Sequence, residues 1–333
     1  MIILGIDTSC DDTSVAVLRE QEVLSNIVSS QVPVHALFGG VVPEIASRKH
    51  VEVIDTVCGQ ALGEAGVSLS DIDAVAVTQG PGLIGSVLVG LLYAKGICAA
   101  TGKPIIGVNH VEAHAMAVLL EEEVEFPFVS LIVSGGHTVI LRFEAPGSYR
   151  IVGSTRDDAV GEAFDKVAKY LKLGYPGGRA IEDLAIGRDR GYVAFPRPMM
   201  GEDTYDFSFS GLKTAFINYF RHGNVSPEVI PDVLASFQEA ACDVLSVKTL
   251  KAARDAGISR IVVGGGVAAN RRLREVFLER AGQEGMEIHF PSVALCTDNA
   301  AMIAKTGFFY ARGGRFSSLD IRGYSRMVRA QAC

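Results

Sequence analysis

Short apolar runs separated by small polar turns open this chain. Ile2 to Asp7, Ser14 to Leu18 and Val23 to Ser29 have the length and the branched apolar content of strands, so they predict a hairpin-rich start to a sheet. Longer apolar segments then predict a mixed sheet with helices. They are a helix from near Glu44, a strand at Ala74 to Thr78, a helix at Leu83 to Ala100 and a strand at Ile105 to Val108.

An acidic run that ends at a proline marks the expected boundary between two lobes. The segment Glu121 to Glu125 is solvated by composition, and Pro127 ends any helix before it. A second sheet begins with Phe128 to Val133 and Thr138 to Phe143. Beyond it the pattern predicts helices at Asp158 to Leu171, Gly178 to Gly187, Ser210 to Phe220 and Pro231 to Ala256, a strand at Arg260 to Val263, helices at Asn270 to Arg280 and Asp298 to Arg312, and a loosely held tail from Arg322.

The two expected sheets open alike. Gly5 to Ser9 leads into Thr13 to Val17 just as Val133 to His137 leads into Thr138 to Leu141, and each pair is strand, small polar turn, strand. Chance can produce such a likeness, and duplicated lobes explain it equally. Two lobes that open this way would bring backbone N–H groups to the mouth of a cleft, where phosphates or carboxylates can be held.

Composition limits the class of protein. A length of 333 residues allows two domains with their own cores, and 48% hydrophobic with 21% charged residues indicates a compact α/β protein. The six cysteines form no Cys-x-x-Cys pair, which favours reduced thiols over a disulfide framework or a zinc ribbon. A formal net charge of −7 means that a nucleic-acid substrate would need help from a partner protein.

The apolar segments do not indicate secretion or a membrane span. Met1 to Asp7 lacks a basic region and a cleavage site, so we expect no signal peptide. Leu83 to Ala100 is interrupted by glycines, a serine and Lys95, whereas a membrane span needs about 18 apolar residues, so we expect a buried helix. The expected location is the cytoplasm.

His110 and His114 are the strongest candidates for a metal site. They follow the strand at Ile105 to Val108 in a segment typical of a helix, and a spacing of four puts both side chains on one helix face. Asp298, at the expected start of a helix, is our choice for the third ligand. Two structural histidines would give the same pattern.

A metalloprotease is the first alternative for this histidine pair. In the zinc-protease helix a glutamate base directly follows the first histidine, but here Val111 stands there. Glu112 lies about 200° around the helix from His110 by helical periodicity, so it is poorly placed to act on a water bound to the same metal. The pattern therefore disfavours a protease.

Two further segments could carry chemistry or could be ordinary turns. Thr8 to Thr13 offers hydroxyls and two carboxylates, one of which could orient a nucleophile. Gly264 to Gly266, between a strand and a helix, allows a ligand to approach the backbone, and Asn270 could reach a ribose or a base. Neither a Walker loop nor a Gly-x-Gly-x-x-Gly pattern is present there.

Nearly the whole chain resembles one family, the TsaD tRNA adenosine threonylcarbamoyltransferases, once described as glycoproteases. Many motifs match in order, so the resemblance is specific. The residues that carry it are Gly5 to Thr13, Gly39 to Glu44, Gly80 to Leu83, His110 to His114, Val133 to Thr138, Gly161 to Lys166, Asp206 to Lys213 and Gly265 to Asn270.

The resemblance implies an α/β fold like that of actin, Hsp70 and the sugar kinases, with two duplicated lobes, mixed sheets flanked by helices and a central nucleotide cleft. The expected domains are an N-terminal lobe of residues 1–125, completed by a C-terminal segment of about residues 300–333, and a C-terminal lobe of residues 126–299.

The resemblance also implies the ligands. One divalent metal, iron or zinc, would be bound per subunit by His110, His114 and Asp298, and the adenine nucleotide would be threonylcarbamoyl-AMP, ATP or ADP. The substrate-binding positions carried over by motif are Ile132, Val133, Ser134, Gly135, Gly136, Asp165, Gly178 and Asn270.

The implied reaction moves threonylcarbamoyl from threonylcarbamoyl-AMP to N6 of adenosine 37 in tRNAs that read codons starting with A. Asp12 is our candidate for orienting or deprotonating the amine, although many relatives have Glu where this chain has Asp7 and Asp12. The family implies tRNA as substrate, a TsaB-like inactive paralogue and a TsaE-like ATPase as partners, and a TsaC-like enzyme that supplies the intermediate.

Two other classes remain open on the same fold. An ATP-dependent small-molecule kinase or carbamoyltransferase would show similar hairpins and glycine turns, but sugar kinases need no histidine pair. A non-catalytic nucleotide-binding partner protein should lack the histidine pair and Asp298, and this chain keeps them.

Overall fold

The computed structural model describes residues 1–223 and 225–327. The chain divides into two compact units: Met1–Glu123 together with the segment from Thr297, and Val124–Cys296. The sequence-based division at residue 299 assigned Asp298 to the second lobe, and this is corrected: Asp298 belongs to the first unit. The reason is local, because Asn299 caps a helix of the first unit and Asp298 directly precedes it. Residues 328–333 of the expected completing segment lie outside the described residues.

The sheet of the first unit has the order β3-β2-β1-β4-β5. The first three strands form an antiparallel meander, and β4 and β5 run parallel to β1. The bounds are β1 Ile2–Asp7, β2 Asp12–Arg19, β3 Glu22–Ser30, β4 Ala74–Gly80 and β5 Ile105–Asn109. All the strands expected in this half are confirmed.

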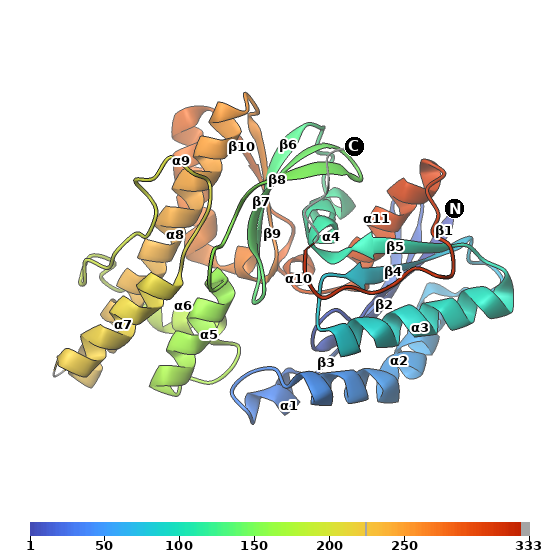
Figure 1. The fold of residues 1–333 in the computed structure, drawn as a ribbon, viewed down its shortest axis with the longest axis horizontal. Helices are drawn as coiled ribbons and strands as arrows, with labels where there is room; N and C mark the ends of the chain where they lie inside the picture. The colour runs from blue at the N-terminus through green and yellow to red at the C-terminus, as the bar shows by residue number, and fades with distance from the viewer. Residues whose placement is uncertain (224, 328–333) are drawn as a thin grey trace. The chain divides into compact units, whose positions relative to one another are not determined.

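Helices cover both faces of this sheet (Figure 1). Leu4 and Ile6 of β1 pack with α2 and α3, whereas Ile3, which points to the opposite face, packs with α4 and α11. The bounds are α1 Val32–Ala36, α2 Pro43–Ala65, α3 Ile84–Thr101, α4 His110–Met116, η1 Ala117–Leu120 and α11 Ala300–Arg312.

Helix α3 is less buried than its sequence predicted. By length and composition alone it could cross a membrane, but Leu91, Ala94 and Cys98 pack against the sheet, as in the core helix of many water-soluble proteins. Its outer side leaves Leu92 62% exposed. Only one side of the helix is therefore buried.

The described part of the C-terminal tail is held firmly, contrary to expectation. The Gln79 side chain donates to the carbonyl of Arg322, and the Gln79 carbonyl accepts from the backbone of Tyr324. Lys95 donates to the carbonyl of Ile321 at 2.7 Å. Residues near the end of β4 and on α3 therefore hold this segment by hydrogen bonds. These partners are distant in the chain, so the local sequence of the tail does not reveal them.

The sheet of the second unit has the order β10-β9-β6-β7-β8. Its first three strands again form an antiparallel meander, and β9 and β10 run parallel to β6. Read from β8, this order repeats that of the first unit, which agrees with duplicated lobes. The bounds are β6 Phe128–Val133, β7 Thr138–Ala145, β8 Ser148–Ser154, β9 Arg260–Gly264 and β10 Glu287–His289.

The helices of the second unit enclose a core centred on α8. Every helix expected in this region is present, with ends that differ by a few residues. The bounds are α5 Val160–Leu171, α6 Gly177–Ala185, α7 Ser210–His222, η2 Pro227–Val229, α8 Ile230–Asp255, η3 Gly266–Ala269, α9 Arg271–Glu284 and α10 Val293–Cys296.

Candidate functional site

The two histidines of the first unit are fixed by a helix cap. Asn109, the last residue of β5, accepts hydrogen bonds from the backbone N–H groups of Val111 and Glu112 at 2.9 and 3.1 Å, so α4 begins directly at the strand end. His110 and His114 lie on one face of α4, both buried, with ring centroids 4.6 Å apart. The predicted helix and shared face are confirmed.

Asp298 completes this cluster from the other end of the chain. One carboxylate oxygen, Oδ1, lies 3.4 Å from His110 Nε2 and 3.2 Å from His114 Nε2. One ligand atom from each of the three residues lies within 4.8 Å of the others. The three sequence-predicted metal ligands therefore come together, all within the first unit.

The donor set fits a divalent transition metal. Two imidazole nitrogens and a carboxylate oxygen are ligands that zinc and iron accept. Both nitrogens of His114 are buried and make no hydrogen bond within the described residues. Such buried polar atoms are costly unless something binds them.

The charges around the cluster attract a cation. Burial disfavours a charged His110, but Asp7 and Asp298 outweigh burial and raise the pKa of His110 to about 10. The histidines in turn hold the pKa of Asp298 well below its usual range although its burial acts the other way. Burial lowers the pKa of His114, which keeps that imidazole neutral.

Asp7 is a neighbour that sequence reasoning gave no role. It ends β1, is fully buried, and its Oδ2 lies 3.4 Å from His110 Nδ1. Its Oδ1 accepts hydrogen bonds from the Thr78 hydroxyl and the Ser9 backbone. The available signal was topological, because the carboxyl ends of the parallel strands β1 and β4 meet at one edge of the sheet.

Asp12 begins β2 after the first turn of the chain. Its Oδ1 is buried without a hydrogen-bond partner among the described residues. Burial, with smaller contributions from Asp298 and Asp11, raises the pKa of Asp12 to about 7, against the opposing effect of hydrogen bonding by Ser30. A carboxyl with such a pKa can exchange a proton near neutral pH.

A buried network supports this turn. His50 Nε2 bonds to the carbonyl of Cys10 at 3.0 Å, and its Nδ1 lies 2.7 Å from the Thr13 hydroxyl. Gln31 bridges His50 to His35. Because the Cys10 carbonyl can only accept, His50 carries its proton on Nε2 and accepts from Thr13, which fixes both ends of the turn that holds Asp12.

In the second unit, the turn between β6 and β7 exposes backbone. Ser134 closes it by exchanging hydrogen bonds with the backbone of His137 at 2.8 and 3.1 Å. Gly135 and Gly136 are exposed and have open space where a side chain would stand. Ile132 and Val133 are buried in β6, so they support the turn rather than present side chains.

Glycines let neighbouring elements approach this turn closely. Gly265 has a φ of 93°, and an added Cβ there would clash with the carbonyl oxygen of Val133. An added Cβ at Gly161 of α5 would clash with the carbonyl of Ser134. The glycine run after β9 is thus required by packing and backbone conformation.

Asp165, Gly178 and Asn270 lie on elements that border this region. Asp165 of α5 accepts from the backbone of Gly177 at 2.8 Å and so anchors the start of α6. Asn270 caps α9 by accepting from Leu273, and its Nδ2 donates to Gln238 at 2.8 Å. The side chain of Asn270 is therefore held in one orientation.

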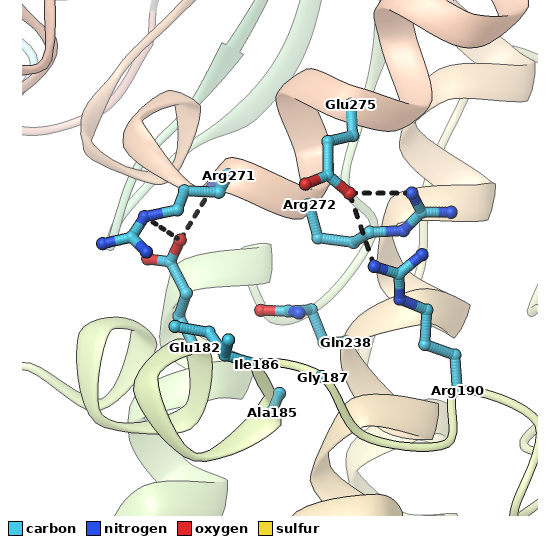
Figure 2. A pocket seen from close by; sticks show the side chains of 9 residues that line it. All are labelled: Glu182, Ala185, Ile186, Gly187, Arg190, Gln238, Arg271, Arg272 and Glu275. Atoms are coloured by element: carbon cyan, nitrogen blue, oxygen red, sulfur yellow. Dashed lines mark hydrogen bonds and ion pairs between the residues drawn. The ribbon is translucent and has the colours of Figure 1, made fainter.

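A hollow of about 230 Å³ lies in the second unit between α6, α8 and α9 (Figure 2). Glu182 points into it from α6, 95% buried, and accepts from the backbone of Arg271 at 2.8 Å. Sequence reasoning missed Glu182, although it lies one helical turn after Gly178. The lining residues are Glu182, Ala185, Ile186, Gly187, Arg190, Gln238, Arg271, Arg272 and Glu275.

Comparisons with known proteins agree with these features. The family model of TsaD, tRNA N6-adenosine threonylcarbamoyltransferase, matches residues 22–305. The transferase of that name from Syntrophotalea carbinolica is 50% identical over 335 residues, covering 100% of this chain and 98% of the relative. That of Geotalea uraniireducens is 53% identical, covering 96% and 94%.

The chain belongs to the TsaD family. It is a transferase that forms N6-threonylcarbamoyladenosine (t6A) in tRNA. The two alternative functions, a small-molecule kinase or carbamoyltransferase and a non-catalytic nucleotide-binding protein, are therefore excluded. A solved structure of the activator of 2-hydroxyisocaproyl-CoA dehydratase from Clostridium difficile with bound ADPNP has a TM-score of 0.56 at 15% identity, covering 94% of this chain and 97% of the activator. This likeness supports the actin and Hsp70 type of fold for the TsaD chain.

Proposed function

We propose that t6A formation in this chain uses a metal ion held by His110, His114 and Asp298. The observation that carries the proposal is the convergence of two buried Nε2 atoms on one carboxylate oxygen, at 3.4 and 3.2 Å. Zinc and iron both suit two imidazoles and a carboxylate. A metal bound there supplies Lewis-acid polarisation of a carbonyl or phosphoryl oxygen.

The second unit binds the adenine nucleotide in this proposal. The exposed backbone of Gly135 and Gly136 suits a phosphate, since backbone donors of a tight turn favour anions. Glu182 and Gln238 line a hollow and offer carboxylate and amide groups, which can bond ribose hydroxyls and an adenine edge. The ligands are threonylcarbamoyl-AMP as donor, and ATP or ADP.

Asp12 acts as the base in the proposed transfer. The N6 nitrogen of adenosine forms a bond to the carbamoyl carbonyl carbon, the bond from that carbon to the AMP oxygen breaks, and AMP leaves with the electron pair. The proton released from the amine passes to an Asp12 carboxylate oxygen. A pKa of about 7 makes Asp12 a competent acceptor at neutral pH.

The tRNA substrate is proposed to be adenosine 37 of tRNAs that read codons starting with A. A net charge of −7 gives this chain little general attraction for a polyanion, so a TsaB-like paralogue and a TsaE-like ATPase would assist, while a TsaC-like enzyme supplies the donor. The expected location is the cytoplasm.

Reconstitution tests the proposal. The chain and its partners are incubated with threonine, bicarbonate, ATP and unmodified tRNA, and t6A is measured by mass spectrometry of nucleosides. His110→Ala should lower the rate by about 10³-fold, because a Lewis acid contributes several kcal/mol. His289→Ala, in the second unit, is the control and should retain the rate. A His110→Ala protein with full activity would exclude a metal-dependent mechanism.

A further inference from the structure

Asp7 sits at the inner edge of the proposed metal site without being one of its ligands. It is the last residue of β1 and is fully buried. Its Oδ1 is occupied: the Thr78 hydroxyl donates to it at 2.7 Å, and the Ser9 backbone N–H donates at 3.0 Å. These two bonds fix the plane of the carboxylate.

The second oxygen of Asp7 faces His110. Asp7 Oδ2 lies 3.4 Å from His110 Nδ1, which is an ion-pair distance, and neither atom makes a hydrogen bond in the described part of the chain. A buried carboxylate oxygen without a donor is costly, and a proton on Nδ1 would give each of these two atoms its nearest partner. The opposite ring nitrogen, Nε2, is the one that faces Asp298.

We propose that Asp7 is a positioning residue of the metal centre: it accepts the Nδ1–H of His110, and this fixes the tautomer whose Nε2 lone pair binds the metal. The inference rests on the metal site proposed above. Carboxylates that accept from a metal-bound imidazole hold the ring and raise its basicity. Asp7 does this from the end of β1, and Thr78, which holds its other oxygen, lies on β4, the parallel strand paired with β1.

His114 provides the contrast. Neither of its nitrogens makes a hydrogen bond within the described residues, and its one recorded ion pair there is with Asp298. Among the described residues, no carboxylate therefore forms an ion pair with its Nδ1. His110 is the preorganised ligand of the pair, and His114 depends on its helix and on packing for its orientation.

Asp7→Asn separates this role from a structural one. The substituted amide keeps the shape, and its oxygen can still accept from Thr78 and Ser9. Its NH₂ group then faces His110 Nδ1, which must accept, so the proton moves to Nε2 and the lone pair needed for the metal is lost. The same exchange of acceptor for donor behind a catalytic histidine is known to produce the wrong tautomer.

Zinc affinity is the decisive measurement. Chelator competition on the full chain should give a 10–100-fold weaker zinc dissociation constant for Asp7→Asn. Thr78→Val is the matched control: it removes one bond to Oδ1 but leaves Oδ2 facing His110, so its loss should be clearly smaller. An Asp7→Asn protein that binds zinc as tightly as the wild type, or loses no more than Thr78→Val, overturns the inference.

A second readout does not depend on the variant's stability. NMR of the Nδ1–H of His110 in the zinc-loaded wild type should show the downfield shift and slow solvent exchange of a proton hydrogen-bonded to a carboxylate, and an Nδ1–H without them would overturn the inference. His110→Ala separates the two proposals. If it binds zinc as tightly as the wild type, the metal site itself fails; if it abolishes binding while Asp7→Asn does not, only the role of Asp7 fails.

Discussion

The two units of this chain share one strand order, yet they place different chemistry after their first strand. In the first unit, β1 ends in the buried Asp7, and the turn that follows carries Ser9 and Asp11 and leads to Asp12, the first residue of β2. In the second unit, the turn after β6 carries exposed Gly135 and Gly136. The same strand order therefore presents carboxylates after β1 and exposed glycine backbone after β6.

This difference extends to the next parallel strand. Near the end of β4, the side chains of Thr78 and Gln79 donate hydrogen bonds to Asp7 and to the C-terminal tail. After β9, Gly265 instead allows the backbone to touch Val133. The first unit thus holds charged side chains in place, whereas the second brings backbone segments into close contact, and the proposed division of catalysis and binding between the two units follows this difference.

Asp12→Asn tests the catalytic half of the comparison and has the largest expected effect. Loss of a general base should lower the transfer rate by roughly 10²–10⁴-fold, whereas ADP affinity of the chain should stay within about twofold. Single-turnover formation of t6A and ADP titration calorimetry measure the two quantities. If Asp11→Asn loses the rate and Asp12→Asn keeps it, the neighbouring carboxylate is the base.

Gly265→Ala tests the binding half. A residue other than glycine at a φ of 93° is strained by about 1–3 kcal/mol, and the new Cβ would displace the β6–β7 turn through Val133. We expect roughly 10-fold weaker ADP binding, equal to about 1.4 kcal/mol. Zinc affinity, which belongs to the first unit, should not change.

Gly266→Ala is the matched control for this prediction. Gly266 neighbours Gly265, but its φ is not positive and an added Cβ meets no atom within 4 Å. Its ADP affinity should match that of the wild type. Equal losses in both variants would mean that the glycine run acts through flexibility rather than through close packing.

Much of the fold was predictable because its signals are local. The apolar runs Phe128 to Val133 and Ile105 to Val108 became β6 and β5 within one or two residues. Strand β8 and the three-residue β10 were not predicted. β8 alternates polar and apolar residues over few positions, and β10 lies at the edge of its sheet, so neither carries a distinctive apolar run.

The candidate site was predictable only in part. The spacing of His110 and His114 is a helical signal, and the structure brings them to Asp298 as expected. Asp7 and Glu182 were missed because their importance comes from distant partners: Thr78 is 71 residues from Asp7, and Arg271 is 89 residues from Glu182. Single-sequence patterns do not show which polar residues will be buried together.

The smallest expected effect is a dependence of the free energy of unfolding on pH that comes from the partly buried carboxyl of Asp12. It contrasts with the behaviour of an exposed carboxyl. Burial raises the pKa of Asp12 from 3.8 to about 7. Between about pH 4 and 7 the folded chain therefore keeps a proton on Asp12 that the unfolded chain loses, so the free energy of unfolding falls as pH rises through this window. Because Asp12 is partly exposed, we expect about 1–3 kcal/mol in all.

Asp12→Asn should remove this dependence. The variant should match the wild type near pH 4 and be more stable above pH 7, as measured by urea unfolding followed by circular dichroism in the presence of a chelator. Asp71→Asn is the opposite case: hydrogen bonds from Ser68 lower the pKa of this exposed carboxyl, so its contribution is constant above pH 4 and is lost only in acid. If Asp12→Asn is instead less stable at pH 8, the carboxylate is stabilised in the fold, and a proton-accepting role near neutral pH loses its physical basis.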